Sequence, residues 1–191
     1  MKSLIVCALA LGSAACASEI PYLHRFSAGV GRRDLGKDFE PLERQTAFAL
    51  DYGVRGKGTP LGLEFGFSQS SDDGEVLGVN VDVSTIEAYA GLRYDWSGPY
   101  GATPYLSGGV TYIDGELEAL GVSISDSGTA GYAGAGIDFP LVDNWFLGIG
   151  LRYIISSDLG FAGLEADVDG LLALFKIGYR FWSYGPRSRR Y

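Results

Sequence analysis

The stretch LGLEFGFS (Leu61 to Ser68) decides the fold, because large apolar residues alternate along it with small or polar ones. The apolar set is Leu61, Leu63, Phe65 and Phe67, and the other set is Gly62, Glu64, Gly66 and Ser68. Successive side chains of a β-strand point to opposite faces, so a period of two predicts a strand. This segment therefore predicts a strand that separates an apolar environment from a polar one.

The same alternation returns along the chain after residue 17, in eight segments of about ten residues each. Three clear examples are TIEAYAGLRYDW (Thr85 to Trp96), WFLGIGLRY (Trp145 to Tyr153) and LLALFKIGYRF (Leu171 to Phe181). Helical periodicity is absent, and about ten residues is the length of a tilted membrane strand. The pattern predicts an all-β protein, an eight-stranded antiparallel up-and-down transmembrane β-barrel.

The connections between these segments alternate in length. The long, polar ones are Arg32 to Arg44, Gln69 to Val81, Asp114 to Gly128 and Ser156 to Asp169. The short ones are Arg55 to Thr59, Ser97 to Thr103 and Pro140 to Asn144, and they contain the Gly, Pro, Asn and Asp of tight turns. This asymmetry predicts long loops at one end of a barrel, and short turns and both termini at the other.

The composition of the two faces separates a membrane barrel from a soluble, lipocalin-like one. If the polar face pointed outward into water, abundant Lys, Thr and Glu would be expected on it, whereas it carries repeated Gly and charges of both signs. A mixed-charge face of small residues suits the narrow interior of eight strands, where Arg pairs with carboxylates. The predicted interior ion-pair network is Asp51, Glu64, Glu87, Arg93, Asp95, Asp138, Arg152, Lys176 and Arg180.

Aromatic residues end several segments on the short-turn side. We expect Tyr52, Trp96, Phe139 and Phe181 to form a girdle there, because amphipathic rings favour the headgroup level of a bilayer.

The first residues have the order of a secretory leader, with Lys2, an apolar run and the small residues Ala15-Cys16-Ala17. We predict a signal peptide over residues 1–17, cleaved between Ala17 and Ser18, a barrel over 18–182 and a short basic C-terminal tail over 183–191. The alternative is lipidation of Cys16, but Ser13 stands where a lipoprotein signal would have Leu. Both cysteines, Cys7 and Cys16, lie in the leader.

The net charge of −8 argues against nucleic-acid binding through phosphate neutralisation. The acids gather in the long connections, at Asp72, Asp73, Glu75, Asp114, Glu116, Glu118, Asp126, Asp158, Glu165, Asp167 and Asp169. They lack the spacing of an EF-hand, so solvated surface loops are the simplest interpretation. Apolar residues among the acids favour strands that protrude beyond the bilayer and add a partner's strand at their edges: Val76, Leu77, Val79, Leu120, Val122 and Ile124.

Three segments resemble a known family: TPYLSGGVTY (Thr103 to Tyr112), GYAGAGIDFPLVDNWFLGIGLRY (Gly131 to Tyr153) and IGYRF (Ile177 to Phe181). They are similar to the small porin-family outer-membrane barrels, which include opacity-type surface proteins and the barrel of outer membrane protein A. The resemblance implies insertion by the barrel assembly machinery, which reads an alternating last strand that ends in an aromatic residue. The segment Trp182 to Tyr191 departs from the family, which commonly stops at the terminal Phe.

His24 is the single histidine, and its parity with Phe26 and Ala28 turns it toward lipid at the short-turn end. Barrel enzymes that modify lipid A resemble this chain in size, but their His-dependent sites lie at the opposite end. No GxSxG, HExxH or phosphate-binding loop occurs after the leader. We therefore expect no enzyme, no cofactor and no metal site, and an interfacial role for His24.

The expected function is that of a non-enzymatic outer-membrane surface protein, which contributes to envelope integrity or binds host or surface ligands through its loops. A narrow solute channel is the alternative, with Glu64 and Glu87 as its first candidates, and a lipid A-modifying enzyme is a further one. The expected partners are outer-membrane lipid and lipopolysaccharide. Weak bridging of the acidic loops to lipopolysaccharide by divalent cations, or Ca²⁺ binding, is an alternative to simple solvation of these loops.

Overall fold

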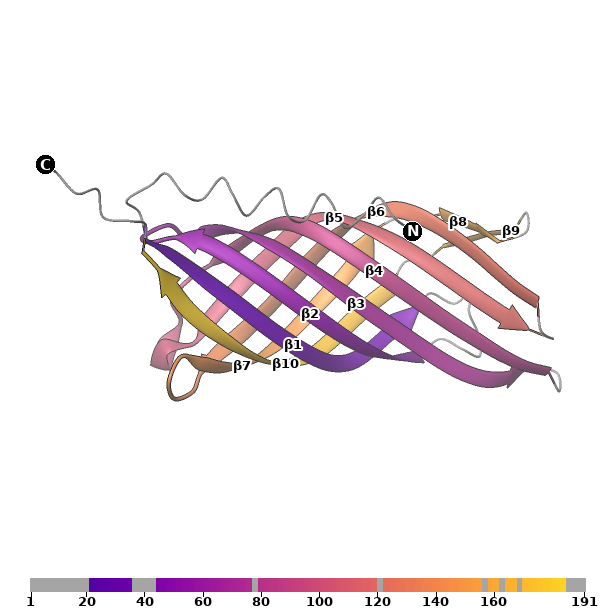
Figure 1. Ribbon diagram of the computed structural model, residues 1–191, viewed down its shortest axis with the longest axis horizontal. Coiled ribbons are helices and arrows are strands. Elements are labelled where there is room, and N and C mark those ends of the chain that lie inside the picture. The colour runs from indigo at the N-terminus through magenta and orange to yellow at the C-terminus, as the bar shows by residue number, and fades with distance from the viewer. Residues whose placement is uncertain are drawn as a thin grey trace, which may run out of the picture.

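The computed structural model describes residues 21–35, 44–76, 79–119, 122–155, 158–161, 164–167 and 170–184. Over these residues, eight antiparallel strands close into a barrel (Figure 1). The strands are β1 (Tyr22–Leu35), β2 (Arg44–Gly56), β3 (Leu61–Val76), β4 (Val79–Asp95), β5 (Thr103–Ala119), β6 (Val122–Pro140), β7 (Trp145–Ile155) and β10 (Gly170–Ser183). The predicted eight-stranded up-and-down barrel is therefore confirmed.

The barrel closes between its first and last strands. β1 pairs with β2 on one side and with β10 on the other, where the register runs from Tyr22 opposite Ser183 to Leu35 opposite Gly170. Closure leaves no unpaired strand edge in the wall, which a structure immersed in hydrocarbon requires. In the described part of the chain, no helix is long and apolar enough to cross a membrane.

The alternating sequence produces two opposed faces. In β7, Phe146, Arg152 and Ile154 are buried inside the barrel, whereas Ile149 and Leu151 on the opposite face are about half exposed. The same outward exposure of large apolar residues occurs on all eight strands of the barrel. A soluble monomer rarely exposes so continuous an apolar surface, and a bilayer would cover it.

Three short turns join strands at one end of the barrel, which we call the short-turn end. The first lies between β2 and β3, the second contains the 3-10 helix η3 (Pro99–Gly101), and the third joins β6 to β7. Asp143 and Asn144 in the third turn have positive φ angles of 53° and 70°, a left-handed conformation that Asp and Asn tolerate well. The opposite end is the long-hairpin end.

Two of the expected long loops are instead mostly paired strands. β3 and β4 remain in register to Val76 opposite Val79, and β5 and β6 to Ala119 opposite Val122. Assigning Gln69 to Val81 and Asp114 to Gly128 to loops was therefore wrong. Polar side chains do not end a strand whose partner still supplies backbone hydrogen bonds. The expectation that these segments form strands is confirmed.

The fourth long connection contains a small two-stranded sheet of β8 (Asp158–Phe161) and β9 (Leu164–Asp167). Several expectations lie outside the described residues: the leader with its cleavage site at Ala17 and Ser18, the cysteines, Leu77, Leu120, and the tail beyond Tyr184.

Candidate functional site

One group of charged side chains fills the interior near the short-turn end, and we call it the short-turn cluster. Its members are Arg25, Arg55, Glu64, Arg93, Asp95, Asp138 and Arg180. Arg93 is its centre, with Nε 2.6 Å from Asp95 Oδ1 and Nη2 2.8 Å from Asp138 Oδ2. Arg25 Nη2 lies 3.1 Å from Glu64 Oε2. The cluster links strands that are not neighbours in the barrel wall.

A second group, the mid-barrel cluster, comprises Arg33, Asp51, Glu87, Arg152 and Lys176. Lys176 Nζ lies 3.3 Å from Asp51 Oδ2, and Arg152 Nη1 lies 3.3 Å from Glu87 Oε1. Hydroxyl groups complete the coordination of the two carboxylates. Asp51 accepts hydrogen bonds from Ser27 and Tyr89, and Glu87 accepts them from Ser68 and Thr111.

The ring of Tyr105 connects the two clusters, and the ring of Tyr89 packs within the mid-barrel cluster. The Arg93 guanidinium lies 3.3 Å from the centre of the Tyr105 ring, and Lys176 Nζ donates to the Tyr105 hydroxyl at 2.8 Å. Glycines make room for these rings, because a Cβ at Gly66 would collide with Tyr89 and one at Gly136 with Tyr105. The glycines on the polar face are thus explained by close packing inside a narrow barrel.

Chemically, this interior is a network of buried ion pairs in which basic groups outnumber acidic ones. Among the described residues it holds seven basic and five acidic side chains. Burying a charge is costly unless it is paired, so each carboxylate needs its guanidinium or ammonium partners. The side chains occupy the lumen, which favours a structural plug over an open pore.

All nine residues predicted for the interior network lie in these two clusters. Sequence reasoning missed Arg25, Arg33 and Arg55, and also Tyr105, which joins the clusters, and Tyr89. Arg25 and Arg33 share the parity of Ser27, but the glycines of the first strand weaken its alternation.

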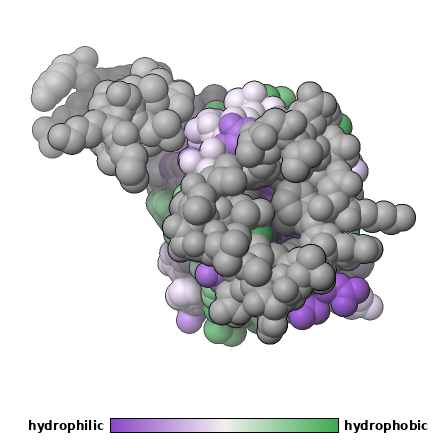
Figure 2. Space-filling view, turned by 90° about the vertical axis from the view of Figure 1, so that its right-hand side faces the viewer, coloured by the Kyte–Doolittle hydropathy of each residue, from purple (hydrophilic) through white to green (hydrophobic). Residues whose placement is uncertain are grey.

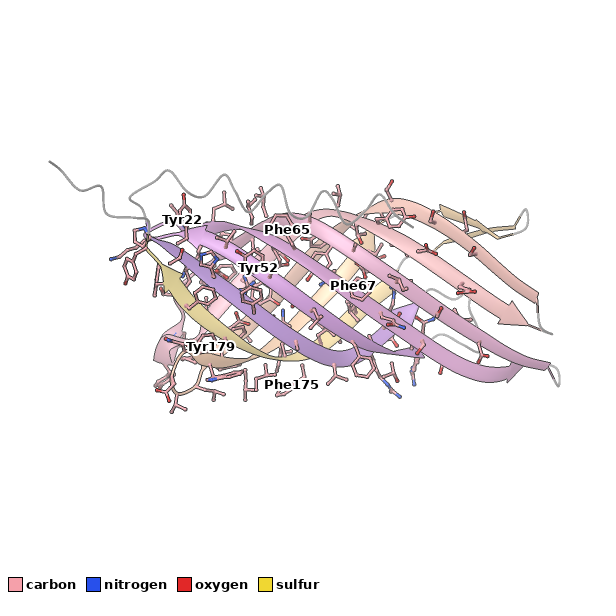
Figure 3. The ribbon with its side chains drawn as sticks, in the orientation of Figure 1. Tyr22, Tyr52, Phe65, Phe67, Phe175 and Tyr179 are labelled. Atoms are coloured by element: carbon pink, nitrogen blue, oxygen red, sulfur yellow. The ribbon has the colours of Figure 1, made fainter. Side chains whose placement is uncertain are left out.

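The expected girdle residues lie on the outer surface toward the short-turn end. Trp96, Phe139 and Phe181 are exposed, and Tyr52 is half-buried. Figure 3 shows Tyr52 and Tyr179 near this end, and Phe67 and Phe175 farther along the barrel.

His24 lies among these outer aromatics and stacks on Phe181, with the ring centres 4.9 Å apart. Its Nδ1 is 2.8 Å from the Tyr52 hydroxyl, and its Nε2 is 2.7 Å from Ser183 Oγ. These contacts join β2, β1 and β10 at the seam where the barrel closes. No group of three or more metal-ligating side chains occurs in the described parts of the chain.

Comparisons with known proteins agree with this barrel fold. The chain is similar in structure to Ail, the attachment invasion locus protein of Yersinia pestis, with 20% identity, 86% of this chain and 100% of Ail covered, and a TM-score of 0.58. For Neisserial surface protein A the identity is 14%, the coverage 84% and 97%, and the TM-score 0.57. For the N-terminal barrel domain of Pseudomonas aeruginosa OprF these values are 15%, 84% and 97%, and 0.53.

Identities this low show a shared fold alone. A search of curated protein sequences gave no significant match. The family model of the outer membrane protein beta-barrel domain, however, matches residues 3–181, which is nearly the whole chain. The closed barrel, its apolar outer surface and this match together show that the chain belongs to the outer membrane protein β-barrel family.

Proposed function

We propose that this chain is a non-enzymatic surface protein of the outer membrane, and that its β3–β4 and β5–β6 hairpins bind a partner with a basic surface. In this proposal the short-turn end faces the periplasm and the long-hairpin end faces the outside of the cell. The observation that carries the proposal is that both hairpins stay paired far beyond the last outward-facing apolar residues.

The length of the hairpins supports an exposed, ordered binding surface. On β4, outward-facing Ile86 is followed toward the tip by outward-facing Ser84 and exposed Asp82. Pairing continues for five more residues from Ser71 opposite Ser84, which is roughly 16 Å along the strand. A stem that served only to span the bilayer would not need this extension.

The charge of the two hairpins points to the chemistry of the partner. Residues 69–82 and 114–128 contain no Lys or Arg, and they carry eight acids: Asp72, Asp73, Glu75, Asp82, Asp114, Glu116, Glu118 and Asp126. In the end view of Figure 2, hydrophilic patches lie beside hydrophobic residues of the wall. A surface of one sign attracts partners of the opposite sign and repels others.

The ligand crystallised with one similar protein has the opposite chemistry. Ail has been crystallised with the heparin analogue sucrose octasulfate. A polysulfated ligand would be repelled by the acidic hairpins of this chain. We therefore expect this chain to bind a basic protein surface, either through side-chain contacts or by pairing with a strand of the partner at a hairpin edge.

The channel and the enzyme are less well supported. The mid-barrel and short-turn clusters occupy the lumen, and His24 lies on the outer surface at the short-turn end. We propose in addition that the leader is cleaved between Ala17 and Ser18 and that the basic tail extends into the periplasm. The barrel assembly machinery recognises β10, which contains Phe181. Lipopolysaccharide surrounds the outer half of the barrel.

Adhesion of cells that display the protein tests the proposal. Cells carrying the wild type should be retained on surfaces coated with basic matrix proteins and not on heparin. Deleting residues 72–82 or 115–125 should reduce that retention several-fold, while replacing Asp143 by Asn in a short turn should not. Equal retention by the hairpin deletions and the wild type would contradict it. Planar-bilayer recordings on the same protein should show no unitary conductance.

A further inference from the structure

We propose that the periplasmic mouth of the barrel holds a binding site for one small oxyanion, a phosphate or a carboxylate group. The site lies at the opposite end from the acidic hairpins, and it does not depend on the surface-binding role.

A pocket that opens to solvent lies at the short-turn end. Four arginines line it, together with two carboxylates: Arg25, Arg55, Arg93, Arg180, Asp95 and Asp138. Exposure rises toward the opening, from 3% for the Arg93 side chain to 21% for Arg180 and 28% for Arg55. A ligand that enters from solvent would meet Arg55 and Arg180 first.

The ion pairs of these two outer arginines are long. Arg55 Nε lies 3.6 Å from Asp95 Oδ2, and Arg180 Nη2 lies 3.5 Å from Asp138 Oδ2. Both distances exceed the usual 2.7–3.2 Å of an N–H···O hydrogen bond, roughly the range in which Arg93 binds the same carboxylates. Arg93 binds Oδ1 of Asp95 and Oδ2 of Asp138. Arg55 and Arg180 are attracted to the same two carboxylates without a short ion-pair contact to them.

Unused hydrogen-bonding atoms remain in the cavity wall. Within the described residues, Nε of Arg55 and both Nε and Nη2 of Arg180 are buried without a hydrogen-bond partner. Leaving a buried donor unsatisfied costs free energy, and more so when it is charged. A guanidinium group binds phosphate or carboxylate through two parallel N–H···O hydrogen bonds. An oxyanion between Arg55 and Arg180 would therefore satisfy these donors.

The charge balance sets the charge of the ligand. The short-turn cluster has four guanidinium groups and three carboxylates within the described residues, which leaves one positive charge uncompensated. A monoanion would neutralise it. Asp138 Oδ1 is also buried without a hydrogen-bond partner in the described part of the chain, and it is an acceptor. A monoanion that also carries a hydroxyl, as dihydrogen phosphate does, would use this atom as well.

The test is calorimetric titration of the folded, full-length barrel in neutral detergent with inorganic phosphate or acetate. Sodium chloride at the same ionic strength is the control, and micelles doped with phosphatidylglycerol test whether a lipid headgroup is the source. The wild type should bind phosphate or acetate with a 1:1 stoichiometry and at least tenfold more tightly than chloride. No heat with either oxyanion, or binding equal to that of chloride, would overturn the proposal.

Two substitutions locate the site. Arg55→Gln and Arg180→Gln should each weaken phosphate binding about tenfold, and the double variant should abolish it. Arg44→Gln, which removes an exposed arginine at the other end of the barrel, should leave binding unchanged. Undiminished binding in the double variant would overturn the assignment. If the double variant fails to fold, broadening of the phosphate ³¹P signal by the wild type and by each single variant decides the question.

Discussion

Replacing Arg93 by Met should destabilise the barrel more than any single change of an exposed charge. Arg93 is 3% exposed and forms ion pairs with three carboxylates, those of Glu64, Asp95 and Asp138. It also lies over the ring of Tyr105. Met has a similar length and apolar stem, so the change removes mainly the charge and its hydrogen bonds.

The size of the effect follows from these contacts. Removing one partner of a buried ion pair costs about 3–5 kcal/mol, because the other charge stays buried without compensation. Arg25 still lies 3.1 Å from Glu64 and 3.3 Å from Asp138, so part of the compensation remains. Loss of the cation–π contact adds about 1 kcal/mol. Because Arg25 keeps part of the compensation, we expect a decrease of about 3–4 kcal/mol in the free energy of unfolding, below the sum of the two contributions.

The assay is equilibrium unfolding in urea in lipid vesicles, followed by tryptophan fluorescence. The matched control is Arg44→Met, because the Arg44 side chain is 71% exposed and its ion pair with Asp34 spans 3.9 Å. That change should produce a small fraction of the loss at Arg93. If Arg93→Met lowered the free energy of unfolding by less than about 1 kcal/mol, the charged interior would not be a tightly coupled network.

Three further predictions address packing, the lipid face and coupling. Gly136→Ala should reduce the heat-modifiable folded band on a gel, because the new methyl group would collide with Tyr105, whereas Gly131→Ala should fold normally because its methyl group would meet its nearest atoms at 3.9 Å. Leu50→Arg should lower the free energy of unfolding in vesicles by about 2–4 kcal/mol, since Leu50 is 61% exposed on the apolar face. Thr46→Arg, nearer the long-hairpin end, is the control. An equal loss for both variants would argue against a position of Leu50 near the centre of the bilayer. Asp51→Asn and Lys176→Met should destabilise the barrel less in combination than the sum of the two single losses, because Lys176 Nζ contacts Asp51 directly, and strict additivity in a double-mutant cycle would show that they do not interact.

The sequence allowed the wall of the barrel to be predicted well because alternation is a local property. Glu64 and Phe65 reveal their opposite faces through their immediate neighbours alone. Whether a strand continues beyond the bilayer depends on its partner strand and not on its own neighbours. For this reason the residues from Ser71 to Val76 were predicted to form a loop. Their polar side chains indicate exposure to water, and a strand can be exposed to water as well as a loop can.

The partners inside the barrel could not be predicted from alternation. Arg93 on β4 meets Asp138 on β6, and Asp51 on β2 meets Arg152 on β7 across the lumen. Such contacts depend on the stagger and tilt of the closed sheet, which a period of two does not encode. Arg25 was missed for a simpler reason, since the glycines around it dilute the alternation of β1.

The most direct test of the central claim is labelling of single cysteines on intact cells with a membrane-impermeant maleimide. Asp82→Cys lies on the β3–β4 hairpin and Asp143→Cys in a short turn, and both positions are exposed. Labelling of the unsubstituted chain gives the background. A barrel that spans the outer membrane with its acidic hairpins outside predicts labelling at position 82 on intact cells, and at position 143 only after the outer membrane is permeabilised. Labelling at 143 but not at 82 on intact cells would contradict the orientation, and equal labelling at both would contradict the membrane-spanning barrel.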